Sequence, residues 1–167
     1  MDEYNMALLI LRVAFGLTMA AHGYAKVFKG GKLAGTAGWF DSIGMRPGAV
    51  HARLAAGTEI LAGLGLAVGL LTTFSAAGFV ALMLVAAWTV HRSNGFFIVS
   101  EGWEYNFILA VGAVGIAMLG PGEWSIDSAI GIDDELNGWL GLLIAGGGGV
   151  AAGIAQLALF FRPPSAS

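Results

Sequence analysis

Glu59 is the residue of this sequence best placed to do chemistry, because it is the only charged residue between Leu54 and Val90. A hydrocarbon core about 30 Å thick takes roughly 20 helical residues per crossing. The 54–90 run therefore predicts two crossings joined by a turn at Gly69–Thr73. A carboxylate inside such a run costs about 2–3 kcal/mol unless it is paired, protonated or bound to a ligand. We interpret Glu59 as the centre of a candidate site.

Other ionisable residues are predicted to reach the same membrane face as Glu59. Four span ends share that face: the end of the first predicted span, the start of the second, the end of the third and the start of the fourth. These four ends carry Glu59 with His22, Lys26, His91, Glu104 and Tyr105. Glu59 lies about 8 Å of helix rise beyond Leu54, and His22 and Lys26 share one helical face. We expect a polar pocket with Glu59 within direct or water-bridged reach of His22, Lys26, His91 or Glu104.

Each of these residues also has a plainer interpretation. Lys26 can extend to lipid headgroups, and His91 and Glu104 can be ordinary residues of a membrane boundary. Glu59 can belong to a purely structural ion pair. His22 and His91 raise a bis-histidine b-type haem site, which we disfavour because ligand sites in helix bundles are usually built in the core. The sequence has no cysteine, which excludes disulfides, thiolate metal sites and covalent c-type haem; no metal site is predicted.

A second candidate contact lies on the opposite membrane face. Arg12 is six residues into the first predicted span, about 9 Å of rise from Met6, and a buried guanidinium needs a partner. Asp127 follows Gly120-Pro121-Gly122 in the acidic loop that returns to this face. We predict a structural ion pair between Arg12 and Asp127 that fixes this loop over the first span.

The elements that must position these residues are apolar helices. The 167 residues are 57% hydrophobic and 11% charged, against about 25% charged in soluble domains. The glycines at 146–149 are expected to remain helical, because unsatisfied backbone is prohibitive in lipid. Glycine-rich helix faces are also a possible route to an oligomer. Five spans are predicted: Met6–Ala25, Leu54–Leu71, Phe74–Val90, Tyr105–Gly120 and Leu136–Phe161.

The distribution of basic residues predicts how the chain sits in the membrane. Seven of the eight Lys and Arg residues fall on the face opposite the N-terminus, and the loop at 123–135 on the N-terminal face is acidic. By the positive-inside rule the N-terminus is extracytoplasmic and the C-terminus cytoplasmic. We expect a multi-pass protein of the plasma (inner) membrane. The basic first loop is explained by topology and anionic lipid, so no nucleic-acid partner is predicted.

The order and spacing of several short motifs resemble the DoxX family of bacterial membrane proteins. The resemblance covers about Leu8 to Asp127. It implies a four-helix membrane bundle, here a DoxX-like core at residues 1–127. With the five predicted spans, we expect an all-α, polytopic transmembrane bundle in which an acidic loop, a fifth transmembrane helix outside the family core and a short tail follow at 128–167. The motifs are His22-Gly23-x-x-Lys26, Gly57-Thr58-Glu59-Ile60 with Gly63, Gly69 and Thr72, His91 with Gly95-Phe96-Phe97, Glu104-Tyr105, and Gly120-Pro121-Gly122-x-Trp124-Ser125-Ile126-Asp127.

Three hypotheses about function follow from these observations. Because the family resemblance implies a link to quinone-coupled redox assemblies, the leading one is an accessory subunit of a membrane redox complex. In it Glu59 and His91 bind or protonate a quinone head group, and His22 and Glu104 orient them. The second is a structural or assembly protein without catalytic activity, in which the same residues form a salt-bridge network. The third is a small-ligand or proton-coupled transporter that uses Glu59. Whether the chain is an enzyme is left open by the sequence.

Overall fold

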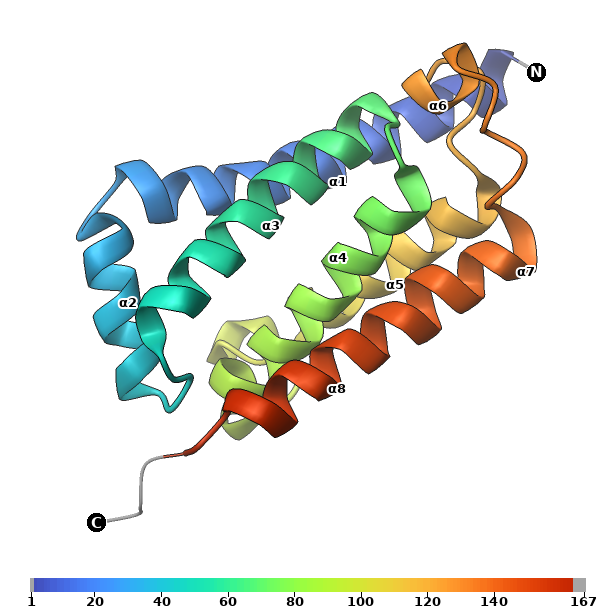
Figure 1. Cartoon of the computed structure of the whole chain (residues 1–167). Coiled ribbons are helices and arrows are strands. Elements are labelled where there is room, and N and C mark those ends of the chain that lie inside the picture. Colours follow the sequence, from blue (N-terminus) through green and yellow to red (C-terminus); the bar gives the residue numbers. More distant parts are fainter. Residues whose placement is uncertain (1, 164–167) are drawn as a thin grey trace.

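The computed structural model describes residues 2–163, and helices form almost all of the regular structure in that range (Figure 1). Residues 87–91 and 142–148 are π-helical turns that continue α4 and lead into α8, respectively. The helices are α1 (Asp2–Phe28), α2 (Lys32–Ser42), α3 (Gly48–Val68), α4 (Thr72–Ala86), α5 (Glu104–Leu119), α6 (Ile126–Ala129), α7 (Gly138–Gly141) and α8 (Gly149–Phe160).

Three helical runs among the described residues are long and apolar enough to cross a membrane, namely Asp2–Phe28, Thr72–Asn94 and Gly138–Phe160. The helix α5 is apolar but shorter, and α3 is long enough but carries His51, Arg53 and Glu59. A helical run thus occupies each of the five predicted spans. The structure supports a polytopic membrane protein, and the number of crossings stays a prediction.

The turn between α3 and α4 lies where the sequence predicts it. The helix α3 ends at Gly69, whose φ of 67° is left-handed, and Leu71 precedes α4 with a φ of 46°. Glycine adopts this conformation without the clash that a Cβ atom causes. Arg12 also lies so close to Gly69 that a Cβ atom there would overlap its guanidinium. The two helices are therefore joined by a hairpin that leaves room for Arg12.

The most extensive helix contact among the described residues is between α1 and α3. A Cβ atom added at Gly63 would lie 2.6 Å from the carbonyl oxygen of Gly16, and one added at Gly23 would lie 2.9 Å from Cβ of Glu59. Small residues allow helix backbones to approach closely in lipid, where apolar side chains gain little from contact with each other. Glycines on both helices therefore set the distance between α1 and α3.

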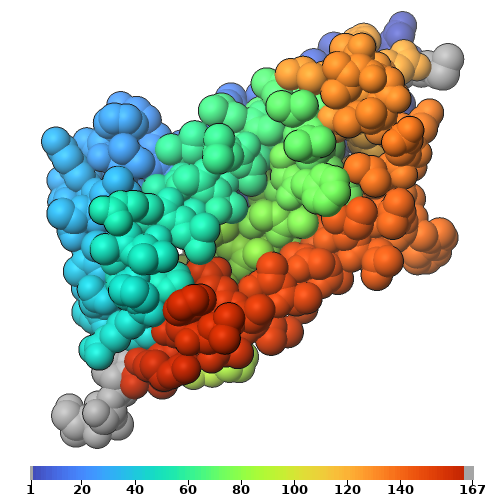
Figure 2. All heavy atoms as spheres, viewed as in Figure 1, coloured from blue at the N-terminus to red at the C-terminus, as the bar shows by residue number. Residues whose placement is uncertain are grey.

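The glycine-rich C-terminal run remains helical, as the sequence predicts. Residues 142–148 form the π-helical turns, and α8 begins at Gly149. This run lies alongside α4, as the space-filling view also shows (Figure 2). Added Cβ atoms at Gly149 and Gly153 would lie 2.7 Å from Val80 and 2.9 Å from Leu84. Both glycines therefore pack within the chain, and oligomerisation through glycine-rich helix faces stays a prediction.

The two ends of the bundle are built differently. The start of α1 lies beside α6 at one end, and the end of α8 lies near α2 at the other (Figure 1). At the α2 end, Phe161 forms an antiparallel bridge with Met45, and the Arg46 N–H donates to the Phe160 carbonyl at 3.3 Å. The described chain thus begins and ends at opposite ends, as the predicted orientation requires. Residues 164–167, which include the C-terminus, lie outside the described residues.

The contact between α1 and α3 predicts that a single methyl group added there lowers the stability of the protein. We expect Gly63→Ala to lower the free energy of unfolding by about 1–3 kcal/mol, because the methyl group overlaps the Gly16 carbonyl. Gly57→Ala is the matched control in the same helix, since a Cβ atom there meets no atom within 4 Å. Thermal unfolding in detergent measures both. Equal melting temperatures for the two variants would contradict this account of the contact.

The predicted orientation can be tested with cysteines placed at the two ends. Lys29 follows α1 and Glu135 precedes α7, and both are exposed. We expect Glu135→Cys to react with an impermeant maleimide on intact cells, and Lys29→Cys to react only after permeabilisation. The cysteine-free chain supplies the background control. The reverse pattern would show that the positive-inside rule fails for this protein.

Candidate functional site

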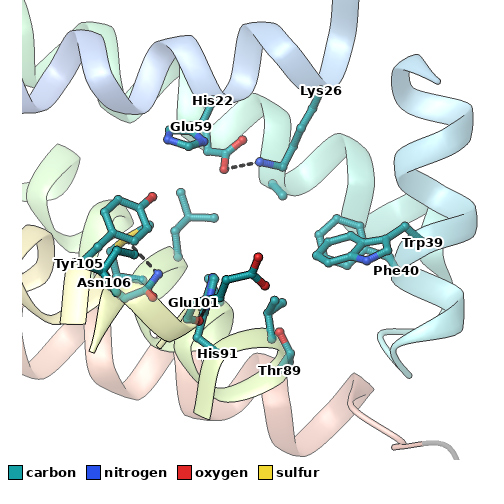
Figure 3. Close-up of a pocket in the computed structure, with 16 residues that line it drawn as sticks. His22, Lys26, Trp39, Phe40, Glu59, Thr89, His91, Glu101, Tyr105 and Asn106 are labelled. Atoms are coloured by element: carbon teal, nitrogen blue, oxygen red, sulfur yellow. Dashed lines mark hydrogen bonds and ion pairs between the residues drawn. The ribbon is translucent and has the colours of Figure 1, made fainter. Parts of the chain in front are cut away.

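A cavity of about 350 Å³ lies at the α2 end of the bundle, and helices α1 to α5 all contribute to its lining (Figure 3). Its polar lining residues come from α1, α3, α5, the end of α4 and the loop after it. Apolar and aromatic side chains, among them Trp39, Phe40 and Met83, line the rest. The polar residues are His22, Lys26, Glu59, Thr89, His91, Glu101, Tyr105 and Asn106.

Glu59 forms an ion pair with Lys26 on one side of this cavity. Nζ of Lys26 lies 2.6 Å from Oε1 of Glu59, which confirms the expectation that Glu59 reaches a nearby ionisable group. The Glu59 carboxylate is almost buried and the Lys26 side chain is about a quarter exposed. The other oxygen, Oε2, is buried and has no hydrogen-bond partner among the described residues. The pair therefore satisfies only half of the carboxylate.

His22 and Tyr105 flank the ion pair. Their rings are 6.1 Å apart between centroids, and both side chains line the cavity near Glu59 (Figure 3). His22 comes from α1, one turn before Lys26, and Tyr105 comes from the start of α5. The structure thus brings together three helices whose ends were predicted to share this face.

His91 lies on the opposite side of the cavity, at the end of the π-helical turn that continues α4. Its Nδ1 is 2.7 Å from the backbone carbonyl oxygen of Glu101. A carbonyl oxygen only accepts hydrogen bonds, so Nδ1 carries the hydrogen, and Nε2 of the neutral ring is an acceptor. Turns of π-helix are frequent at functional sites. The arrangement provides a fixed imidazole whose free nitrogen can accept a hydrogen bond or a proton.

The prediction that Glu104 belongs to this pocket is wrong. Its Oε2 accepts a hydrogen bond from the Ile98 N–H at 2.9 Å, and Glu104 is not among the residues that line the cavity. The loop from 95 to 103 folds back on itself, with the Glu104 N–H donating to the Phe96 carbonyl at 2.8 Å. Glu104 closes this loop, and the loop directs Glu101 to the cavity instead.

Sequence reasoning also missed Asn106, which is buried in the lining of the cavity. Its Nδ2 donates to Sδ of Met83 at 3.6 Å, and its Oδ1 has no partner among the described residues. An amide inside an apolar span is a signal that could have identified this residue, because polar groups in membrane helices usually face the bundle interior. Glu101 carries no comparable signal, since it lies in a loop.

A second buried polar contact attaches the C-terminal run to α3. Nδ1 of the buried His51 lies 3.1 Å from Nε2 of Gln156 in α8. His51 also packs edge-on against Phe160, with ring centroids 4.9 Å apart. Neither residue was predicted to matter. This contact holds α8 beside the cavity end of the bundle without lining the cavity.

At the α6 end the predicted ion pair between Arg12 and Asp127 is replaced by contacts with other partners. Nη2 of the buried Arg12 donates to the Trp124 carbonyl oxygen at 2.6 Å. The Asp127 carboxylate accepts from the backbone N–H groups of Leu71 and Thr72 and from the Thr72 hydroxyl, at 2.7 to 2.9 Å. Asp127 attracts Arg12 electrostatically, but within residues 2–163 the two form no direct ion pair.

The reason for this difference is the start of α4. The first N–H groups of a helix lack partners in the helix, and its positive dipole end attracts a carboxylate. Asp127 occupies that position, and its own N–H donates to the Gly69 carbonyl at 2.8 Å. The loop is therefore fixed over the first helix, as expected, through Trp124 on one side and the α3–α4 turn on the other.

Comparison with known protein families matches residues 7–92 of the chain, just over half of its length, to the family model of DoxX. The matched segment contains α1 to α4 and the π-helical turn. It holds five of the eight polar residues that line the cavity, namely His22, Lys26, Glu59, Thr89 and His91. No curated protein and no solved structure matches the chain.

The contacts of Asp127 predict a stability effect at the α6 end. We expect Asp127→Asn to lower the free energy of unfolding by about 1–3 kcal/mol, because an amide cannot accept all the hydrogen bonds of this turn. Glu135→Gln, in the same acidic loop and exposed, should leave stability unchanged. Thermal unfolding in detergent measures both variants.

The same experiment extends to a double-mutant cycle. Arg12→Met combined with Asp127→Asn should cost less than the sum of the single changes, because each removes a charge that balances the other. Strict additivity would show that the two residues stabilise the loop independently.

Proposed function

This chain belongs to the DoxX family, and on that premise we propose that it is an accessory subunit of a quinone-linked membrane redox complex whose cavity at the α2 end holds the quinone head group. The family and the apolar helices already indicate an integral membrane protein. A bound quinone exchanges electrons with a partner. The chain has no cysteine to hold a thiolate-ligated cluster, so we assign electron transfer to other subunits of the complex.

The observation that carries this proposal is the combination of polar and apolar groups in one cavity. A quinone head group is a planar ring with polar oxygens at two opposite positions and an apolar tail. The cavity has polar groups on two opposite sides, Lys26 and Glu59 on one and His91 on the other (Figure 3). Between them lie aromatic and aliphatic side chains such as Trp39 and Met83. The volume of about 350 Å³ is in the range of small-ligand sites.

The polar residues take the following roles in the proposed site. Lys26 keeps two N–H groups beyond its bond to Glu59, so it can donate to a ring oxygen. His91, held by the Glu101 carbonyl, presents Nε2 to the ligand. His22 and Tyr105 orient the ring beside Glu59. Glu101 takes the second orienting position that the sequence assigned to Glu104.

A structural role is the second candidate, and the short Lys26–Glu59 distance of 2.6 Å favours it. An ion pair between α1 and α3 can lock the bundle without any ligand. Replacing one residue of such a pair by a neutral residue leaves the charge of the other without a partner. Under this alternative Glu59→Gln and Lys26→Met each destabilise the protein, and no saturable ligand binding is found at the cavity.

Fluorescence quenching by a soluble quinone tests the proposal. Trp39 lines the cavity, whereas Trp139 lies in α7 and is 80% exposed. We expect decylubiquinone to quench the purified protein saturably, with the saturable part lost in Trp39→Phe and kept in Trp139→Phe. Quenching that rises linearly with concentration in all three proteins would reject a quinone site.

Glu59 and Glu135 provide a test variant and a matched control variant for the same titration. Glu59→Gln should weaken decylubiquinone binding at least tenfold, because the amide no longer holds Lys26 in place. Glu135→Gln, exposed in the segment between α6 and α7, should bind like the unchanged protein. Equal affinities in a folded Glu59→Gln variant would remove Glu59 from the site.

A further inference from the structure

Resting on the proposed quinone site, we propose that the cavity binds the reduced, two-hydroxyl quinol form of the head group in preference to the oxidised quinone. The two forms differ in hydrogen-bonding character. Quinone carbonyl oxygens only accept hydrogen bonds, whereas quinol hydroxyl groups also donate them. The preference follows from an excess of acceptor atoms around the cavity.

Two of these acceptors are buried oxygens on α3 and α5. Among residues 2–163, Oε2 of Glu59 has no hydrogen-bond partner, since Lys26 binds the other oxygen, and Oδ1 of Asn106 has none either. The Asn106 amide is oriented by its Nδ2, which donates to Sδ of Met83. Its oxygen is therefore the group left without a partner. Buried acceptors without donors are costly, and both residues line the cavity.

Two further acceptors lie on the opposite side. Nε2 of His91 is an acceptor, because Nδ1 donates its hydrogen to the Glu101 carbonyl. The Glu101 carboxylate extends into the cavity in the close-up view (Figure 3), and its side chain has no hydrogen bond or ion pair within residues 2–163. A head group spanning the cavity thus meets, at both ends, acceptors that have no partner among the described residues.

The donors of the cavity do not balance these acceptors. The Lys26 ammonium group is bound to Glu59 and keeps two further N–H groups, but both buried cavity atoms that lack a partner among the described residues, Oε2 of Glu59 and Oδ1 of Asn106, are acceptors. The Tyr105 hydroxyl both donates and accepts, and the His22 ring does so through its two nitrogens. An oxidised quinone would bring two more acceptors against Glu59, Asn106 and His91. A quinol places a hydroxyl donor at each end, and so it satisfies groups that the protein leaves unpaired.

Anaerobic titration of the full-length purified protein with decylubiquinol and with decylubiquinone tests this preference. We expect the quinol to bind at least tenfold more tightly. The ratio of the two dissociation constants should fall towards one in Asn106→Leu and in Glu101→Gln, and remain unchanged in Glu135→Gln. Glu101 is exposed, so Glu101→Gln keeps the test valid where Asn106→Leu fails to fold.

A redox titration of the bound decylubiquinone couple gives a second measurement that needs no variant. Tighter binding of the reduced form raises the midpoint potential, and a tenfold preference corresponds to about 30 mV for a two-electron couple. Equal binding of the two forms, or an unchanged or lowered potential, would overturn the quinol preference and leave the quinone site standing. Failure of both forms to bind would instead reject the proposed function itself.

Discussion

The close approach of α1 and α3 is the constraint on which the rest of the structure depends. Gly16, Gly23 and Gly63 bring the two backbones together, and a Cβ atom at any of them would overlap the facing helix. In lipid, where apolar side chains gain little by meeting each other, such packing between small residues is what holds helices together. The same contact surface places Lys26, one turn after Gly23, against Glu59. One turn before Gly16, it places Arg12 against the α3–α4 hairpin.

The two ends of this contact have opposite character. At the α6 end every oxygen of Asp127 and the carbonyl of Trp124 are bound within the chain, so the loop is closed over the helices, although Nε and Nη1 of Arg12 have no hydrogen-bond partner among the described residues. At the α2 end several polar atoms stay unpaired around a cavity, among them one oxygen of Glu59. Buried polar groups are normally satisfied, and those that are not mark strain or function. The unpaired oxygens at the α2 end belong to residues that line the cavity, which is why we assign ligand binding to that end and stability to the other.

The errors of the sequence-based analysis have a common cause. Glu104 and Asp127 were both assigned by the membrane face that their segments reach, Glu104 to the pocket and Asp127 to Arg12, and both instead satisfy backbone N–H groups of a nearby loop or helix start. A carboxylate beside unsatisfied N–H donors binds them before it reaches a distant cation, because the donors are close and fixed. Hydropathy does not report where a loop exposes such donors. Glu101, which replaces Glu104 at the cavity, was missed for the same reason.

The sequence by itself determined the membrane character, the helical runs, the turn at Gly69 and the pairing of Glu59 with a neighbouring ionisable group. These follow from hydropathy, helix geometry and the cost of an isolated carboxylate, which act along each segment. The tertiary structure decided which atoms remain free: Oε2 of Glu59, Oδ1 of Asn106 and, through the Glu101 carbonyl, Nε2 of His91. The first two depend on how α1 packs on α3 and α5 packs on α4, and the third depends on how the loop at 95–103 folds against the end of the α4 run. The fold of this loop is set by hydrogen bonds that no local sequence pattern predicts.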